Sequence, residues 1–430
     1  MDSVGESAVS SLVTRAECIA DGSILQAFDH FDRPRMAWLR TDDRRIAGGA
    51  IATVTASGPD RFETVRRRAT AARGTDTTGP AGAPPRWYGG GAFAPSATDE
   101  WPAFAATQFV LPAVVAARID GDTWLVVRGR DRSRVDTRFD RLRATIAGQE
   151  PPRHEPPGVA SVRRRPDRPE WTRQVEHATE AIDAGRLQKV VLARSLVADL
   201  DRAIDAGSAL ADLDGSYPDC TRFAIAPAGG GTFLGATPET LLDHRGRTVR
   251  TTALAGSAAR GPSAAADADR AAELQASEKD DREHGIVVEA IREQLDALPA
   301  SVRVGSRRLR RLASVQHLET PIEARLDDDT HALTVVDALH PTPAVGGQPI
   351  DRALDWIADR ERIDRGWYAA PVGWFDARGD GSFAVAIRSA LVREDRARCF
   401  AGAGIVADSD PDAEWSETEL KYRPMLDLFR

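Results

Sequence analysis

The segment AGAGIVADSDPDAEWSETELKYRPML, residues 401–426, joins a strand of small residues to a loop and then to a helix. Asp410 is expected to cap this helix, and Pro411 to occupy its first position. Glu414, Glu417 and Lys421 follow at spacings of i, i+3 and i+7, which place all three on one helix face. An apolar stripe runs beside that face: Trp415, Thr418, Tyr422, Met425 and Phe429. Two carboxylates and an ammonium beside a buried face indicate either an ordinary i, i+4 ion pair or a functional site.

Composition restricts the class of protein. The chain has 430 residues, 42% of them hydrophobic, and a net charge of −8, which argues against a general nucleic-acid binder. Three widely spaced cysteines suggest neither a disulfide framework nor a zinc site. No apolar run reaches the length of a membrane span, and the first residues lack the pattern of a signal peptide. We therefore expect a cytoplasmic protein with no nucleic-acid or membrane partner.

Lysine is rare in this chain. Only three of the 57 Lys and Arg residues are lysines, namely Lys189, Lys279 and Lys421. A buried lysine, unlike arginine, can lose its proton near neutral pH, and it can also act as a compact point charge. Chance placement would explain any single one of them. All three occur among other polar residues, which favours a chemical role.

Lys189 lies near the start of a predicted strand, residues 186–200, that follows a predicted helix at 170–185. Alternation places Lys189, Val191 and Ala193 on one face of this largely apolar strand. Two interpretations are open. Lys189 is either an edge lysine with a buried stem and a solvated amine, or a desolvated amine with a lowered pKa that serves as a general base.

Other polar side chains have two interpretations as well. Glu239 follows a turn at Thr237–Pro238 and is either a first-turn carboxylate or an acid. Arg388 is predicted inside an apolar strand, where it needs an anion, either from an ion pair or from a substrate carboxylate. Glu283 and Glu417, on separate predicted helices, provide the oxygen ligands that Mg²⁺ prefers. These residues alone predict a magnesium-assisted acid–base enzyme that acts on a small carboxylated substrate.

The remaining pattern predicts mixed α and β structure. Strands are expected at 44–58, 123–131, 247–256, in a pair over 310–326, and in a hairpin over 372–392; helices are expected at 59–74 and, as one long element, at 264–298. Residues 75–91 are predicted to form a loop, and the Pro/Arg-rich stretch 149–171 an internal connection.

Ten segments in this order resemble the chorismate-utilising enzymes, a family that includes isochorismate, anthranilate, aminodeoxychorismate and salicylate synthases. They span about 170–426: QKVVLARS, GATPETLL, ALAGSAARG, SEKDDREH, SVQHLET, LHPTPAVGG, ERIDRGWYAAPVGW, AIRSALV, AGAGIV and EWSETELK. A weaker similarity to the N-terminal part of isochorismate synthases is found in three earlier segments, GGAIATV, DRFETV and FVLPAVV.

The resemblance implies an α+β fold: a single large domain of two stacked antiparallel β-sheets flanked by helices, with the active site between the sheets. Residues 1–150 would form the N-terminal part and 151–430 the catalytic region. Lys189 would activate water for attack at C2 of chorismate, and Glu239 would protonate the departing C4 hydroxyl. Glu283 and Glu417 would hold Mg²⁺.

Further roles are implied for residues at matching motif positions. The implied substrate-binding residues are Ala255, Thr342, Tyr368, Arg388, Gly404 and Lys421, and the implied supporting residues are Glu278, His284, His317 and Glu414. Lys279 is expected to be structural, within an ion-pair network on its helix.

Ala255 distinguishes between branches of the family. Aminodeoxychorismate synthases have a PIKGT-like loop whose lysine attacks C2, whereas ALAGS places Ala255 there, so water is the expected nucleophile. No tryptophan-sensing motif of the anthranilate branch is found, and no obligatory amidotransferase partner is expected. Isochorismate synthase, feeding menaquinone biosynthesis, is favoured. Salicylate synthase, with the same base and metal sites but a subsequent pyruvate elimination, stays open, and anthranilate synthase component I is less favoured.

Overall fold

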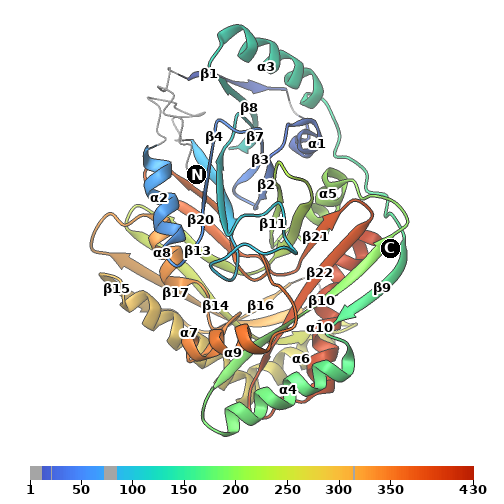
Figure 1. Cartoon of the computed structure of the whole chain (residues 1–430), viewed down its shortest axis with the longest axis vertical. Helices are drawn as coiled ribbons and strands as arrows, with labels where there is room; N and C mark the ends of the chain where they lie inside the picture. The colour runs from blue at the N-terminus through green and yellow to red at the C-terminus, as the bar shows by residue number, and fades with distance from the viewer. Residues whose placement is uncertain (1–11, 21, 72–84, 313–314) are drawn as a thin grey trace.

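The computed structural model describes residues 12–20, 22–71, 85–312 and 315–430. Two antiparallel sheets stack on one another and helices flank them (Figure 1). The predicted α+β fold of two stacked sheets is confirmed. Within the described ranges, no helix is both long enough and apolar enough to cross a membrane.

Among the described residues, the first sheet has twelve strands. In spatial order they are β1 (Val13–Ile19), β8 (Asp122–Gly129), β7 (Val114–Ile119), β3 (Arg44–Gly48), β2 (Arg35–Leu39), β11 (Thr221–Ala226), β12 (Thr232–Thr237), β21 (Ser389–Arg393), β22 (Arg396–Ile405), β10 (Lys189–Leu200) and β18 (Gly347–Gln348), with β9 (Val159–Arg165) also paired to β10.

In the part of the chain that the structure describes, the second sheet has ten strands. Its order is β15 (Ala300–Val304), β17 (Val315–Leu326), β14 (Thr248–Ala259), β13 (Thr240–Arg245), β20 (Gly381–Val385), β19 (Pro371–Asp376), β5 (Arg86–Gly91), β6 (Thr107–Leu111) and β4 (Ala52–Ala56), with β16 (Arg308–Arg311) also paired to β17. Strands that precede residue 150 belong to both sheets. The boundary proposed at that residue stays a prediction.

Helices flank the two sheets. They are α1 (Ala27–His30), α2 (Arg61–Ala71), α3 (Arg132–Ile146), α4 (Arg168–Asp183), α5 (Ala206–Ser216), α6 (Ala264–Ala276), α7 (Glu278–Asp296), α8 (Ala332–Leu339), α9 (Ile350–Arg360) and α10 (Pro411–Leu426). On the first sheet, Phe28 of α1 and Phe139 of α3 belong to the same buried cluster as Leu39 of β2. On the second, the His331 ring at the start of α8 packs 5.0 Å from that of Phe375.

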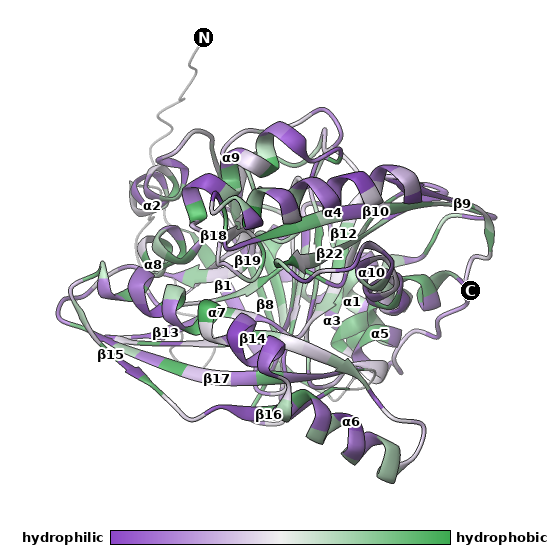
Figure 2. Ribbon diagram, turned by 90° about the horizontal axis from the view of Figure 1, so that it is seen from below, coloured by the Kyte–Doolittle hydropathy of each residue, from purple (hydrophilic) through white to green (hydrophobic). Residues whose placement is uncertain are grey.

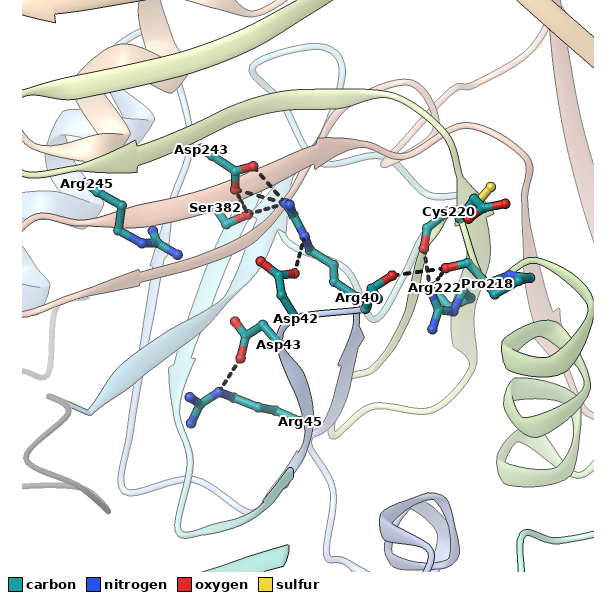
Figure 3. A network of polar contacts seen from close by, with 12 residues as sticks. Arg40, Asp42, Asp43, Arg45, Pro218, Cys220, Arg222, Asp243, Arg245 and Ser382 are labelled. Atoms are coloured by element: carbon teal, nitrogen blue, oxygen red, sulfur yellow. Dashed lines mark hydrogen bonds and ion pairs between the residues drawn. The ribbon is translucent and has the colours of Figure 1, made fainter. Parts of the chain in front are cut away.

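A polar network joins the two sheets (Figure 3). Arg40, just after β2 of the first sheet, donates to the carboxylate of Asp243 on β13 at 2.9 Å and to Ser382 Oγ on β20 at 3.1 Å. Ser382 Oγ in turn donates to Asp243 at 2.5 Å. Because Arg40 and its partners belong to different sheets, this cluster fixes one sheet relative to the other.

Three local predictions were wrong. The single helix expected at 264–298 is two helices, because Ser277 has extended backbone angles (φ −69°, ψ 114°) and its hydroxyl caps α7 by accepting from Asp280 N. Residues 86–91, expected in a loop, form β5, where a Cβ on Gly89 would lie 1.9 Å from Gln108 O of the neighbouring strand. The residues expected as a loop at 75–84 lie outside the described ones. Arg388 does not lie inside a strand but between β20 and β21, where the chain passes from the second sheet to the first.

The start of α10 is as predicted. The Asp410 side chain accepts from Asp412 N and Ala413 N, and Pro411 occupies the first turn. Pro424 lies in the last turn, and the helix ends at Leu426. Capping and the conformation of proline are local properties, which explains why the sequence predicts them well.

Candidate active site

A cavity of about 270 Å³ lies between the sheets, lined by β10 and β22 of the first, β14 of the second, and helices α7 and α10. Figure 1 shows these elements in the lower half of the molecule, and Figure 2 shows them from below. The predicted residues that line it are Lys189, Glu239, Ala255, Glu283, His317, Tyr368, Arg388, Gly404, Glu414, Glu417 and Lys421. The structure thus brings together side chains separated by more than two hundred residues.

Lys189, the first residue of β10, is 2% exposed, so its amine does not extend into bulk solvent. Its Nζ donates to Glu283 Oε1 of α7 at 2.7 Å. Gly404 on β22 makes this approach possible, because a Cβ there would lie 2.7 Å from Lys189 Cε and 3.1 Å from Glu283 Oε1. The small-residue strand noted in the sequence therefore makes room for the amine and the carboxylate.

Glu239 lies in the link between β12 and β13, where the chain crosses between sheets, and is 8% exposed. Burial raises the pKa of Glu239 to about 7, against the opposing influence of the positive charges of Arg388, Lys189 and Lys421. A carboxyl with this pKa is protonated in about half of the molecules at pH 7 and in most of them at lower pH. Glu239 is thus suited to donate a proton.

Helix α10 presents three charged groups to the cavity. Lys421 Nζ lies 2.6 Å from Glu417 Oε1 and donates to Gly402 O at 2.8 Å. Glu414 accepts from Ser409 Oγ at 2.8 Å. Burial, together with the charge of Glu417, raises the pKa of Glu414; burial acts on Glu417 too, but the Lys421 ammonium outweighs it and lowers the pKa of Glu417. Of the two carboxyls, Glu417 is therefore the ionised one.

The acidic residues fit a magnesium ion. Glu283 of α7 and Glu417 of α10 line the same cavity, and a lysine Nζ lies 2.7 Å from Glu283 Oε1 and 2.6 Å from Glu417 Oε1. Among the residues that the structure describes, no three His, Cys, Asp or Glu side chains form a metal-ligand cluster. Two carboxylates are nevertheless a donor set that Mg²⁺ accepts, since it usually keeps water and substrate oxygens as its other ligands.

Arg388, Tyr368 and His317 form the remaining polar wall. Arg388 has a left-handed backbone (φ 50°), and its guanidinium makes no ion pair within the described ranges. The Tyr368 ring stacks on Phe400 of β22, 5.2 Å between centroids. His317 Nδ1 lies 2.7 Å from Ser257 Oγ, and burial with the nearby charges of Arg388 and Lys421 lowers the pKa of His317 to about 3. A neutral histidine and an uncompensated arginine leave this wall ready to accept an anion.

A family model described as chorismate binding enzyme matches residues 2–430. The chain belongs to this family. It is 36% identical to a salicylate biosynthesis isochorismate synthase of Pseudomonas aeruginosa, over 94% of this chain and 86% of that protein, and 37% identical to isochorismate synthase MenF of Bacillus subtilis, over 80% and 74%. Among solved structures, the menaquinone-specific isochorismate synthase MenF of Escherichia coli matches with a TM-score of 0.83 and 28% identity, over 98% of this chain and 95% of that one.

Three predicted residues of this chorismate-binding enzyme do not line the cavity: Thr342, Glu278 and His284. His284 is buried, and burial lowers its pKa. Its Nδ1 donates to Ala255 O at 3.1 Å, and its Nε2 lies 2.7 Å from Thr320 Oγ1, so it fastens α7 to β14 and β17. Thr342 is buried in the turn before Val345, and Glu278 is exposed at the start of α7. Their functional roles stay predictions.

Two features of the site were missed or misjudged. Lys279 is not part of an ion-pair network on its own helix; it lines the cavity and has its ion-pair partner, Asp408 at 4.0 Å, in the loop after β22. Arg365, also at the cavity, forms an ion pair with Glu361 in which both side chains are 3% exposed. The i, i+4 spacing of Glu361 and Arg365 was visible, but α9 ends at Arg360, so helical periodicity did not indicate their pairing.

Proposed function

We propose that this chorismate-binding enzyme is an isochorismate synthase, which converts chorismate to isochorismate by moving a hydroxyl group from C4 to C2. The relatives at 36% and 37% identity are named isochorismate synthases, and so is the solved structure with the TM-score of 0.83. Ala255 at the cavity wall supports water as the nucleophile, because its methyl side chain cannot attack the substrate ring.

The reaction needs one base and one acid. Lys189 takes a proton from water as the water oxygen bonds to C2; the ring double bond shifts, the C4–O bond breaks, and the departing hydroxyl takes the proton of Glu239. One water enters and one leaves, so the net change is an isomerisation. The observation that best supports this assignment is the pKa of Glu239, which burial raises to about 7 beside a buried lysine. To act as the base, Lys189 must be a neutral amine, which can donate one N–H to Glu283 Oε1 and direct its lone pair at the water.

Chorismate carries two carboxylates, and the cavity offers cations for both. Arg388 and Lys421 line it, and we assign to them the binding of substrate carboxylates, with Tyr368 beside them. Glu283 and Glu417 would hold Mg²⁺, which when bound supplies positive charge that neutralises and orients a substrate carboxylate.

The pathway and setting are part of the proposal. Menaquinone biosynthesis is favoured because of the similarity to proteins named MenF. A cytoplasmic location and independence from an amidotransferase stay predictions. Salicylate synthase remains the second candidate, since elimination of pyruvate from isochorismate in the same cavity would need no further cofactor.

Product analysis tests the proposal. Purified protein with chorismate and Mg²⁺ should form isochorismate alone, identified by chromatography and mass. Salicylate plus pyruvate would support the second candidate. A product formed only with added ammonia would indicate the aminating branch, and no product from a folded protein would refute an enzymatic role.

The variant Lys189→Ala tests the role of Lys189 as the base. The base is lost while the substrate contacts of Arg388 and Lys421 remain, so turnover should fall by about 10²–10⁴-fold with the circular dichroism spectrum preserved. Near-normal turnover in this variant would remove Lys189 from the mechanism without affecting the identity of the product.

A further inference from the structure

A second groove, of about 260 Å³, lies at the far end of the strands that build the active site. It is bordered by Arg163 and Arg165 of β9, Arg393 of β21, Arg396 and Arg398 of β22, and Glu100 of the loop before β6. Figure 1 shows β22 and β10 side by side, with β21 and β9 on either side of them. Five arginines and one glutamate give this groove a positive charge on a chain whose net charge is −8.

The groove is separate from the active site although it shares a sheet face with it. Arg398, Phe400, Gly402 and Gly404 alternate along β22 and therefore point to one face. Gly402 and Gly404 line the active-site cavity, whereas Arg398 lines the groove. Between them Phe400 is fully buried under Trp101, whose ring lies 5.5 Å away. The two cavities are thus divided by a wall of aromatic rings.

Several guanidinium groups in the groove lack an anionic partner. Arg165 and Arg393 form no ion pair with any residue that the structure describes, and Arg393 Nε is buried without a hydrogen bond. The Arg398 side chain is 13% exposed; its Nη1 contacts Glu100, but its Nε and Nη2 are buried without a partner. The Asp199 carboxylate partly balances the charges of two further arginines: its oxygens lie 3.4 Å from Arg163 Nη2 and 3.0 Å from Arg396 Nε. Buried donors of this kind are costly unless a ligand or an ordered water accepts from them.

A purely structural role does not explain the whole cluster. Arginines on an edge strand discourage pairing with another chain, which explains Arg163 and Arg165 on β9. Arg393 and Arg398 lie on β21 and β22, which have paired neighbours on both sides and need no such protection. Arg398 is also held in place, with its guanidinium over the Phe400 ring at 5.1 Å.

We propose that this groove binds a small polyanion with two or more phosphate or carboxylate groups. The planar guanidinium fork presents paired donors that match either group, and several forks around one cavity favour a multiply charged ligand over a single anion. Val197 and Leu391 form an apolar part of the lining and suit a short carbon or bridging segment between the charged groups.

Isothermal titration calorimetry on the full chain in magnesium-free buffer tests this proposal, with inorganic pyrophosphate and citrate as separate probes. At least one should bind saturably. Tighter binding of pyrophosphate assigns phosphate chemistry, and tighter binding of citrate assigns carboxylate chemistry. Arg398→Met and Arg393→Met should each weaken the affinity about tenfold, as expected for the loss of a charge-assisted hydrogen bond.

Two controls locate the binding. Arg303→Met on β15 removes an exposed arginine of the other sheet and should leave the affinity unchanged. Lys421→Met removes a cation of the active site and should also leave it unchanged. Absence of saturable binding of both probes, native affinity in both groove variants, or loss of binding in Lys421→Met would each overturn the proposal. Circular dichroism spectra verify that the variants are folded.

Discussion

At the scale of single residues, Glu239 links pH to catalysis. Its proton must be present for donation to the leaving hydroxyl, and burial raises its pKa to about 7. We expect kcat/KM to fall as the pH rises above about 7, and Glu239→Gln to lose about 10²–10⁴-fold in kcat, because an amide is a poor proton donor. Steady-state kinetics from pH 6 to 9 measure both. If kcat/KM of the native enzyme did not fall as the pH rises past about 7, Glu239 would be excluded as the acid.

The same residue links pH to stability. Its pKa is about 7 in the folded chain and about 4.3 when unfolded, so the folded state holds the proton more tightly. The stabilisation that this bound proton gives the folded state is fully present below about pH 4.3 and is lost as the pH rises through 7, a change of up to about 4 kcal/mol. Urea unfolding at pH 5 and pH 8 should show a larger decrease in unfolding free energy for the native chain than for Glu239→Gln. Equal decreases would contradict the raised pKa.

At the scale of elements, α7 and α10 each contribute one carboxylate whose charge a lysine already balances. Glu417→Gln should weaken Mg²⁺ binding at least tenfold, because a metal ligand is lost. Lys421→Met should instead tighten Mg²⁺ binding in the absence of substrate, because the competing ammonium is removed from Glu417. Calorimetric titration with Mg²⁺ alone measures both effects. Unchanged Mg²⁺ binding in Glu417→Gln, or weaker binding in Lys421→Met, would refute the metal assignment.

The segment after α9 fixes β10. Arg365 Nη2 donates to Val191 O at 2.7 Å and Nη1 to Val345 O at 2.8 Å, while Glu361 Oε2 accepts from Ala193 N. This buried pair therefore fixes the strand that begins with Lys189 and the turn that borders the cavity.

Arg365→Met should lower the free energy of unfolding by about 3–5 kcal/mol, because Glu361 would be left buried and unpaired. Arg362→Met is the matched control: its side chain is 66% exposed, 3.6 Å from Glu170, and its loss should change stability by less than about 0.5 kcal/mol. Denaturant unfolding compares the two. Similar values for both variants would show that the buried pair does not fix β10.

At the scale of the whole molecule, the active site depends on how the two sheets are placed, because β10 and β22 belong to one and β14 to the other. Arg40 links the sheets through Asp243 and Ser382. Arg40→Ala should lower the free energy of unfolding by about 1–3 kcal/mol, since Asp243 loses a charged partner. Arg247→Ala, which removes an exposed pair with Asp329, should have little effect in the same urea experiment. An equally small effect of Arg40→Ala would show that this bridge contributes nothing to the packing of the sheets.

The sequence by itself determined what depends on local chemistry. The α10 cap at Asp410, the strand with Lys189 at its start, and the ordered motifs of the chorismate-binding family could all be identified without coordinates, because capping, alternation and motif order are properties of neighbouring residues. The rarity of lysine in the chain also favoured a chemical role for Lys189 and Lys421.

Only the tertiary structure decided which of these groups meet. Lys189 and Glu283 are 94 residues apart and pair because β10 and α7 border the same cavity. The position of Arg388 between the sheets depends on packing that no short window contains, whereas the break at Ser277 carries a local capping hydroxyl that the helical pattern around it obscured. The arginine groove arises from four adjacent strands, two of them distant in sequence from the others. Local preferences select helices and strands, whereas long-range strand pairing and burial set distances, charges and pKa values.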